Sequence, residues 1–314
     1  MIRHAASPGR RFTATRREAI AGYLFVGPAL LGFLLFQAAP LVLSLFYSLT
    51  NFNMLDWQWV GLRNYQRLFT VDNYIGIAVS NTLYLAVIGV PLGIVAGLGL
   101  AVLLNQNIPG MRVFRTIYYL PVVMPTVAAT ILWINLFGPT NGLINNLLGV
   151  VGIRGPQWFY DPLFTKPALI IMGLWGVGGS MVLYLAGLQG VPKELHEAAQ
   201  LDGAGRWQAF RSVTIPTISP VLFFTFITGI IGSLQIFNQV YVIDQNFAGG
   251  QGTSSIGGPG FSTLVYMTRL FDEGFRQFRK GYASAMAVLL FVFIMLLTAF
   301  LFKVVGARVY TEVG

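Results

Sequence analysis

The chain alternates between long apolar stretches and short polar ones. Each uncharged run exceeds the roughly 20 residues that a helix needs to cross about 30 Å of hydrocarbon. Six such runs occupy residues 19–55, 73–111, 116–153, 167–192, 212–243 and 281–302. They predict an all-α, polytopic membrane protein with six transmembrane helices, near residues 20–49, 78–104, 114–137, 168–189, 217–239 and 282–303. Six spans place both termini on the same side of the membrane.

One polar stretch, residues 190–216, separates the fourth and fifth runs. Pro192 suits the first turn of a short helix, where its missing N–H is no loss. Gly203 is expected to end that helix, because glycine adopts a left-handed conformation without strain. Ala198 and Ala199 give the helix a slim side that lets the backbone of a partner come close. The first half of the stretch therefore predicts a docking helix.

A second short helix is expected to follow. Trp207, Phe210 and Val213 recur at three-residue spacing, and Pro216 is expected to break the run. An amphipathic helix that lies on the membrane surface would give a similar periodicity. That alternative leaves the alanine pair and the Asp202-Gly203 pair without an explanation.

Composition and charge agree with a membrane protein. The chain is 55% hydrophobic and 10% charged with a mean hydropathy of +0.67, whereas soluble domains carry roughly 25% charged residues. The net charge of +9 raises the possibility of a nucleic-acid partner, but the basic residues are scattered among loops. The positive-inside effect explains them more simply. The absence of cysteine excludes disulfides, thiolate metal sites and cysteine nucleophiles.

Basic residues gather in the segments that would share one side, at 1–19, 105–113, 190–216 and 304–314. This bias predicts a multi-pass protein of the cytoplasmic membrane of a bacterium or archaeon, with both termini in the cytoplasm. The first run is too long for the apolar part of a signal peptide and is expected to be a retained span. The predicted organisation is a basic cytoplasmic tail (1–18), a six-helix transmembrane domain (19–305) and a cytoplasmic C-terminal tail (306–314).

The polar stretch carries a family resemblance. Glu197-Ala198-Ala199, then Gly203, then Val213-x-Ile215-Pro216, is similar to the EAA loop of importer-type ABC permeases, and EAAQLDGAGRWQAF is most similar to the carbohydrate branch. Val213 and Ile215 stand where that family more often has isoleucine and leucine. The resemblance implies a cytoplasmic coupling helix that seats in an ATPase subunit. The residues implied in this coupling are Glu197, Ala198, Ala199, Asp202 and Gly203.

The resemblance covers roughly residues 20–305 and implies the type I ABC importer permease architecture. The implied partners are a second permease subunit in a heterodimer, a dimer of ATP-binding subunits, an extracytoplasmic solute-binding protein, a carbohydrate and the lipid bilayer. ATP and Mg²⁺ would be bound by the ATPase subunit, and this chain would hold no cofactor. One stretch departs from the family pattern: Gly257-Gly258-Pro259 follows Asp244 only after a glycine-rich segment, which is expected to be an insertion in an outer loop.

The search for catalytic chemistry is negative. The chain has no Gly-Lys pair and therefore no Walker A motif. His196-Glu197 begins a pattern like that of zinc proteases, but Gln200 stands where the second histidine is needed, so no metal site is expected. The prediction is a protein that is not an enzyme and that draws energy from another subunit.

The predicted spans carry neutral amides in place of acidic groups. Amides donate and accept hydrogen bonds, which suits a ligand rich in hydroxyl groups. The expected substrate pathway comprises Gln235, Asn238, Gln239, Trp175 and Ser180. Amides also join membrane helices to one another, so a purely structural role stays open. Two other functions stay open as well: an ion-coupled secondary carrier, and a membrane scaffold or enzyme without transport.

Overall fold

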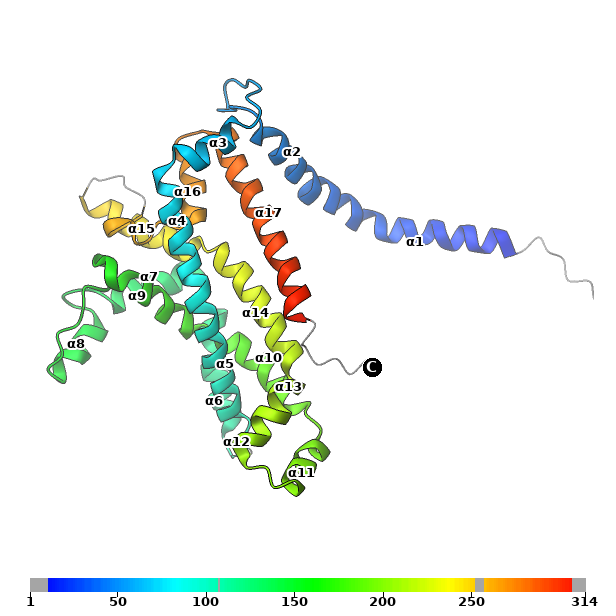
Figure 1. Cartoon of the computed structure of the whole chain (residues 1–314), viewed down its shortest axis with the longest axis vertical. Helices are drawn as coiled ribbons and strands as arrows, with labels where there is room; N and C mark the ends of the chain where they lie inside the picture. The colour runs from blue at the N-terminus through cyan, green and yellow to red at the C-terminus, as the bar shows by residue number, and fades with distance from the viewer. Residues whose placement is uncertain (1–10, 107, 252–256, 307–314) are drawn as a thin grey trace, which may run out of the picture.

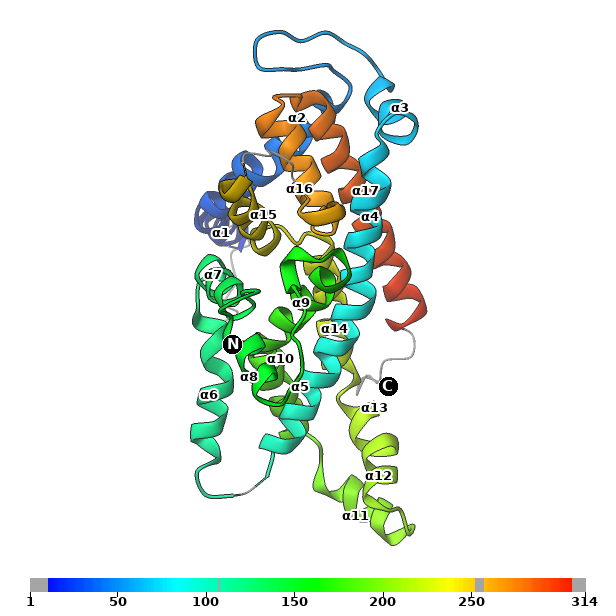
Figure 2. The same ribbon diagram turned by 90° about the vertical axis from the view of Figure 1, so that its left-hand side faces the viewer.

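A computed structural model describes residues 11–106, 108–251 and 257–306. Throughout these ranges the named elements are helices, and one antiparallel bridge joins Thr50 to Trp59. The helices form an elongated bundle (Figures 1 and 2). The polar stretch projects from one end of the bundle as α11 (Lys193–Leu201) and α12 (Arg206–Ala209). We call the opposite end, where α2 meets α3, the distal end.

Four helical stretches are long and apolar enough to cross a membrane: Glu18–Ser48, Asn73–Leu104, Ser219–Asn246 and Lys280–Val304. Two further stretches are bent pairs of helices. Met111–Val123 and Thr126–Leu136 meet at 101°, and Pro162–Trp175 and Gly178–Gln189 meet at 50°. The count is six when each bent pair forms one span, so the predicted all-α fold with six apolar spans is confirmed.

The elements of the six spans follow in chain order. The first three spans are α1 (Arg11–Phe33), η1 (Leu34–Ala38) and α2 (Ala39–Ser48); α4 (Asn73–Tyr84), η2 (Leu85–Gly89) and α5 (Val90–Leu104); and α6 (Met111–Val123) with α7 (Thr126–Leu136). The last three are α9 (Pro162–Trp175) with α10 (Gly178–Gln189); α14 (Ser219–Leu234) with α15 (Asn238–Gln251); and α17 (Lys280–Val304). Shorter connecting elements are α3 (Arg63–Thr70), α8 (Leu143–Val150), η3 (Trp158–Tyr160), η4 (Phe210–Thr214), α13 (Ile215–Thr217), η5 (Pro259–Phe261), α16 (Tyr266–Phe271) and η6 (Asp272–Arg276).

The first span leaves the bundle at its distal end. Its second half, α2, packs against α17, whereas α1 extends away from the other helices (Figure 1). Most residues of α1 from Glu18 to Phe33 are accordingly exposed, and the side chain of Phe25 keeps 89% of its surface. The predicted tail over 1–18 lies only partly within the described residues. Residues 11–18 form the first turns of α1.

In three helical runs, the helix widens into a π-helix just before a proline. Segments of π-helix, η1, η2 and η4, end two residues before Pro40, Pro91 and Pro216. Proline lacks an N–H and crowds the carbonyl four residues back, and a π-turn moves the hydrogen bond to the fifth residue. The prediction that Pro216 ends the second short helix is therefore wrong: the helical run continues through α13, and the chain bends at Ile218.

Three apolar clusters hold the described part of the bundle together. Near α11, Met181, Tyr184 and Leu188 of α10 pack against Leu104 of α5 and against Ile218. The hydroxyls of Tyr184 and Thr225 lie 2.8 Å apart and join α10 to α14. A second cluster, toward the distal end, packs Trp133 of α7 and Phe137, which follows α7, against α9 and α15. A third cluster packs Leu68 of α3 and Tyr266 of α16 against Tyr282 and Met286 of α17.

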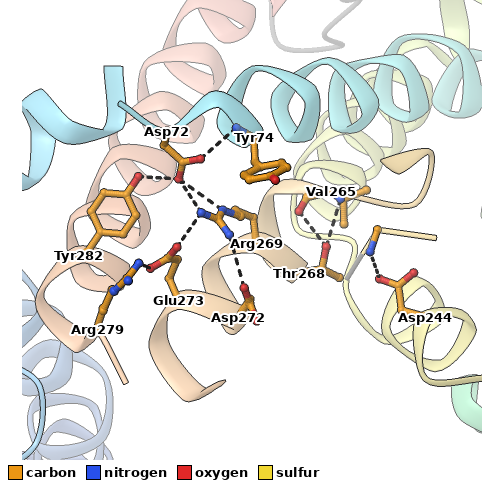
Figure 3. Close-up of polar contacts among 11 residues, drawn as sticks. Asp72, Tyr74, Asp244, Val265, Thr268, Arg269, Asp272, Glu273, Arg279 and Tyr282 are labelled. Atoms are coloured by element: carbon orange, nitrogen blue, oxygen red, sulfur yellow. Dashed lines mark hydrogen bonds and ion pairs between the residues drawn. The ribbon is translucent and has the colours of Figure 1, made fainter. Parts of the chain in front are cut away.

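The distal end is held by buried charges (Figure 3). Arg269 of α16 pairs with Asp72 at 3.0 Å, with Glu273 at 2.6 Å and with Asp272 at 3.4 Å. Arg279 reaches the other oxygen of Glu273 at 3.2 Å. The hydroxyl of Tyr282 donates to Asp72 at 2.8 Å. This network ties α16 and η6 to the start of α4 and to α17.

The network sets the pKa values of two carboxyl groups in opposite directions. Burial raises the pKa of Asp72, but hydrogen bonds from Tyr282 and Arg269 outweigh it, so the pKa lies below its ordinary value. For Asp272 burial dominates over the attraction of Arg269, and the pKa lies above its ordinary value. Burial alone would lower the pKa of Arg269. The hydrogen bond to Asp72 and the charges of the neighbouring carboxylates outweigh burial, so the pKa of Arg269 is raised.

Candidate functional site

The first candidate site is α11, which carries the predicted coupling residues. No side chain of this helix is buried. Glu197 and Ala198 are exposed, and Ala199 is half-buried. Leu201 keeps 89% of its surface exposed. The helix thus presents an exposed surface at the tip of the bundle.

The end of α11 is fixed by backbone geometry. Gly203 has a φ of +77°, and Ala204 donates its N–H to the carbonyl of Ala199 at 2.9 Å while Gly203 donates to Gln200 at 3.0 Å. This pair of bonds is the Schellman arrangement, which needs a left-handed residue at its turn. The predicted glycine stop is confirmed. Asp202, which precedes the turn, is exposed.

The segment after the turn anchors α11 to the bundle. Ala209 of α12 is buried, whereas Trp207 is 74% exposed and stacks on Phe210 at 5.6 Å. A cavity of about 300 Å³ lies between this segment and the ends of α5 and α10, and its polar lining residues are Asn105, His196, Gln200, Arg206 and Thr214. The docking helix is thus held by its neighbour and leaves its own outer surface free.

The second candidate site is a pocket of about 370 Å³ at the break between α14 and α15. Leu85 and Gly89 of η2, Leu169 and Ile170 of α9, and the residues of the break form its walls. The break brings three predicted pathway residues into this one pocket: Gln235, Asn238 and Gln239. We call it the amide pocket.

The three amide side chains are available for a ligand. Across the described residues, none of them forms a side-chain hydrogen bond with the protein. Gln235 and Asn238 are exposed, and Gln239 is half-buried. Amides that join helices would be paired with each other or with the backbone, so this geometry favours contact with solvent or a ligand.

The other two predicted pathway residues lie outside the amide pocket. Trp175 is half-buried at the bend between α9 and α10 and meets Trp133 edge to face at 5.8 Å. The hydroxyl of Ser180 donates to the carbonyl of Val177 at 2.9 Å. Ser180 lies where α10 crosses α5, against Gly97. These positions are typical of helix packing, and a role in the pathway stays a prediction for both.

Two polar residues lie where the sequence did not place them. The spans were expected to lack acidic groups, but Asp244 lies within the fifth, Ser219–Asn246, and is buried. Its carboxylate, drawn in Figure 3, accepts from the N–H of Gly257 at 3.2 Å. It also accepts from the hydroxyl of Thr263. Asp244 therefore fastens α15 to the residues that follow the glycine-rich segment, part of which (252–256) lies outside the described residues. Lys166, which precedes the predicted span near 168–189, lies within α9.

The distal charge network was also missed by sequence reasoning. Asp72 and Arg269 are separated by most of the chain, and no local pattern indicates their pairing. The only local signal is the spacing of Arg269 to Asp272 and Glu273, which places the three side chains on one helical face. This network positions the outer helices and lies apart from both candidate sites.

Comparison with known proteins places these sites in context. A family described as "Binding-protein-dependent transport system inner membrane component" matches residues 89–310. The chain is 36% identical over 315 residues to the "Probable ABC transporter permease protein YesP" of Bacillus subtilis (strain 168), covering 99% of each chain. It is 36% identical over 284 residues to the lactose transport system permease protein LacF of Rhizobium radiobacter, covering 88% of this chain and 91% of that one.

A solved structure shares the fold. A chain of a bacterial alginate ABC transporter, crystallised in complex with a periplasmic protein bound to an alginate pentasaccharide, superimposes with a TM-score of 0.78. The identity is 23%, and the match covers 93% of this chain and 95% of that one. The arrangement of helices is therefore that of an ABC transporter chain.

Proposed function

The chain belongs to the family of binding-protein-dependent transport system inner membrane components, and from this premise we propose that it forms the carbohydrate pathway of an ATP-driven importer. It is a multi-pass membrane permease subunit. The single observation that carries the proposal is the arrangement of two sites on one bundle. An exposed helix stands at one end, and a pocket with unpaired amides lies between the spans.

Coupling to ATP hydrolysis is assigned to α11. Glu197, Ala198 and Ala199 present a charge and two small side chains, and Asp202 and Gly203 fix the turn that follows. Small side chains let a partner's backbone approach closely, and the exposed Leu201 adds an apolar contact. ATP and Mg²⁺ would be bound by a dimer of separate ATPase subunits, whose closure would move α11 and the spans attached to it.

Carbohydrate recognition is assigned to the amide pocket. Sugar hydroxyls both donate and accept hydrogen bonds, and so do the side chains of Gln235, Asn238 and Gln239. Several relatives are named as transporters of lactose, of trehalose and maltose, and of arabinooligosaccharides. These names support a sugar or oligosaccharide as the solute. Trp175 and Ser180 would act by shaping the spans next to the pocket.

The complete importer would contain further subunits. We infer a second permease chain, two ATPase subunits and an extracytoplasmic solute-binding protein. The exposed apolar surface of α1 is consistent with a position against lipid or the second permease. Catalysis of a chemical reaction by this chain forms no part of the proposal.

Orientation follows from the coupling role. α11 would lie in the cytoplasm with both termini, and the distal end would face the binding protein. Because the chain has no cysteine, single cysteines report topology without background. Leu201→Cys, at an 89% exposed position, and Leu55→Cys, at a 97% exposed position, mark the two ends. An impermeant maleimide applied to intact cells should label only the second, and the reverse pattern would contradict the orientation.

The function itself is tested by ATP hydrolysis in a reconstituted complex. The permease pair, the ATPase subunits and the binding protein are assembled in lipid nanodiscs with a panel of oligosaccharides. We expect the bound sugar and binding protein together to stimulate hydrolysis several-fold, and omission of this chain to abolish the effect. Stimulation that persists without this chain would reject the proposal.

A further inference from the structure

Lys166 is a cation beside the amide pocket that the proposed function does not use. It lies on α9, three and four residues before Leu169 and Ile170, which line the pocket. Its ammonium donates to the side-chain oxygen of Asn81 at 3.1 Å. It also lies 4.9 Å from the centroid of the Tyr84 ring. Tyr84 directly precedes Leu85, another residue of the pocket wall.

The positions of Lys166 on α9 and of Asn81 on α4 locate the ammonium group relative to the amide pocket. α4 runs from the distal end toward α11, whereas α9 begins at the side of the bundle and leads into α10 (Figure 1). A helical turn advances about 5.4 Å. Lys166 and Asn81 each lie about one turn before the pocket residues of their own helix. The ammonium group therefore lies at one edge of the amide pocket, about one turn from the residues that form its walls.

The charge of Lys166 has no carboxylate partner among the described residues. The ion pairs of this part of the chain join Arg269 and Arg279 to Asp72, Asp272 and Glu273. The carboxylates of Asp161 and Asp244 have other hydrogen-bond partners. Asp161 accepts from the N–H of Leu163 at the start of α9, and Asp244 is bound to Gly257 and Thr263 and faces the charge of Arg276.

Asn81 holds the ammonium in place. Its amide nitrogen donates to the carbonyls of Phe261 and Leu264 at 2.8 and 2.9 Å, so its oxygen is fixed toward Lys166. A lysine ammonium has three donors, and Asn81 takes one of them. An ammonium within a membrane span, paired only with an amide and an aromatic ring, is costly to keep. A ligand that carries a negative charge would offset that cost.

We propose that Lys166 is a specificity-determining residue that meets a carboxylate of the transported sugar at the edge of the amide pocket. The substrate class is thus an acidic oligosaccharide that contains uronic acid residues. This inference rests on the proposed function and narrows it. The amides bind the hydroxyl groups of a sugar ring, and the ammonium pairs with a carboxylate on the same or the next ring.

A purely structural role for Lys166 makes a different prediction. If the residue only ties α9 to α4, its replacement would affect all sugars equally. The test therefore compares trisaccharides of galacturonate, glucuronate and mannuronate with their carboxyl-reduced, neutral counterparts. Uptake is measured in proteoliposomes that hold the complete importer, its binding protein and internal ATP. The binding protein is the same for every variant, so a change between variants belongs to the permease.

We expect at least one uronate trisaccharide to be imported. Lys166→Gln, which keeps a donor for Asn81 but removes the charge, should lower the initial rate of that import roughly tenfold or more. Lys166→Arg should retain it within about threefold, because a cation remains. The thermal midpoint should not fall in either variant, which shows that the fold is intact.

Three results would count against the inference. Import of the neutral sugars alone would overturn it, as would equal rates for Lys166→Gln and the wild type with a uronate. In both cases carbohydrate import would still stand. Import of none of the trisaccharides, acidic or neutral, would overturn the inference, and the nanodisc assay with a panel of oligosaccharides then decides separately whether the proposed function stands.

Discussion

Gly178, at the start of α10, lies backbone to backbone against Tyr118 of α6. A β-carbon on Gly178 would overlap the carbonyl oxygen of Tyr118 and would lie 3.0 Å from its carbonyl carbon and from the Cα of Tyr119. The two bent spans thus meet at a point where only glycine fits. Neighbouring Gly179 has room, since the nearest atom to its β-carbon is 3.8 Å away on the side chain of Val122.

Gly178→Ala should therefore destabilise the bundle, whereas Gly179→Ala should not. The clash is with backbone, which cannot rotate away, and overpacking of this kind costs about 1–3 kcal/mol. The thermal midpoint of the purified permease measures the difference. Equal midpoints for the two variants would show that α6 and α10 do not pack as described.

The turn after α11 makes a second matched pair. Gly203 has a φ of +77°, and Gly205 has a φ of −68°; a β-carbon at either meets no atom within 4 Å. Gly203→Ala should cost about 1 kcal/mol through backbone strain alone, and Gly205→Ala should cost much less. We expect weaker co-purification of the ATPase subunit for Gly203→Ala only. If co-purification of the ATPase subunit fell equally in both variants, the loss would come from the added methyl group and not from the conformation of the turn.

Bulk on α11 tests the docking surface itself. Ala198→Trp should leave the spans folded, because Ala198 is exposed, and should abolish recovery of the ATPase subunit. Ala198→Ser, which stays small, should retain it. Full recovery with tryptophan at this position would place the ATPase contact elsewhere.

The amide pocket predicts a loss of transport without a loss of assembly. Asn238→Leu removes a donor and an acceptor from the pocket wall, and a lost hydrogen bond costs about 1–3 kcal/mol, which is roughly tenfold or more in rate. Asn246→Leu, on the same helix but outside the pocket, is the control. Initial rates of sugar uptake per assembled complex are compared. If both variants transport normally, the pathway does not run past Asn238.

The distal network gives a dependence of stability on pH with a defined sign. The pKa of Asp72 is lowered in the folded protein, so its contribution is present above about pH 3.9, the ordinary value for aspartate, and is lost as the pH falls through the folded pKa. The pKa of Asp272 is raised, so its charge opposes folding at neutral pH. Asp72→Asn should lower the thermal midpoint at pH 7, because hydrogen bonds to a charged group contribute about 1.5–3 kcal/mol. Asp272→Asn should not lower it. Midpoints measured as the pH falls from about pH 5 toward about pH 2 should decline less steeply for Asp72→Asn than for the wild type, and parallel curves in that range would contradict the assignment.

The apolar runs were enough to predict the six spans, because hydrocarbon thickness constrains helix length directly. The turn at Gly203 was also predictable, since few residues adopt a positive φ. The 101° bend before Thr126 had a signal in Pro125, which disfavours a helical conformation at the residue before it, but several prolines of this chain sit inside helices. Pro216 is one of them, and η4 accommodates it.

The candidate sites were predictable to different degrees. The residues of α11 are contiguous, so one local pattern contains them all. The amide pocket depends on the break at Gln235, where no proline or glycine marks the end of α14. Lys166 and Asn81, or Asp72 and Arg269, meet only because distant spans pack together. Such tertiary contacts leave no periodicity in a single sequence.

The measurement that tests the central claim most directly is sugar uptake into proteoliposomes under three energy sources. The complete importer, with its binding protein outside, is supplied with internal ATP, with a non-hydrolysable ATP analogue, or with an imposed proton or sodium gradient. The proposed role predicts uptake with ATP alone, and its loss when Ala198→Trp replaces the wild-type chain. Uptake driven by an ion gradient without ATP would instead identify a secondary carrier and would contradict the account.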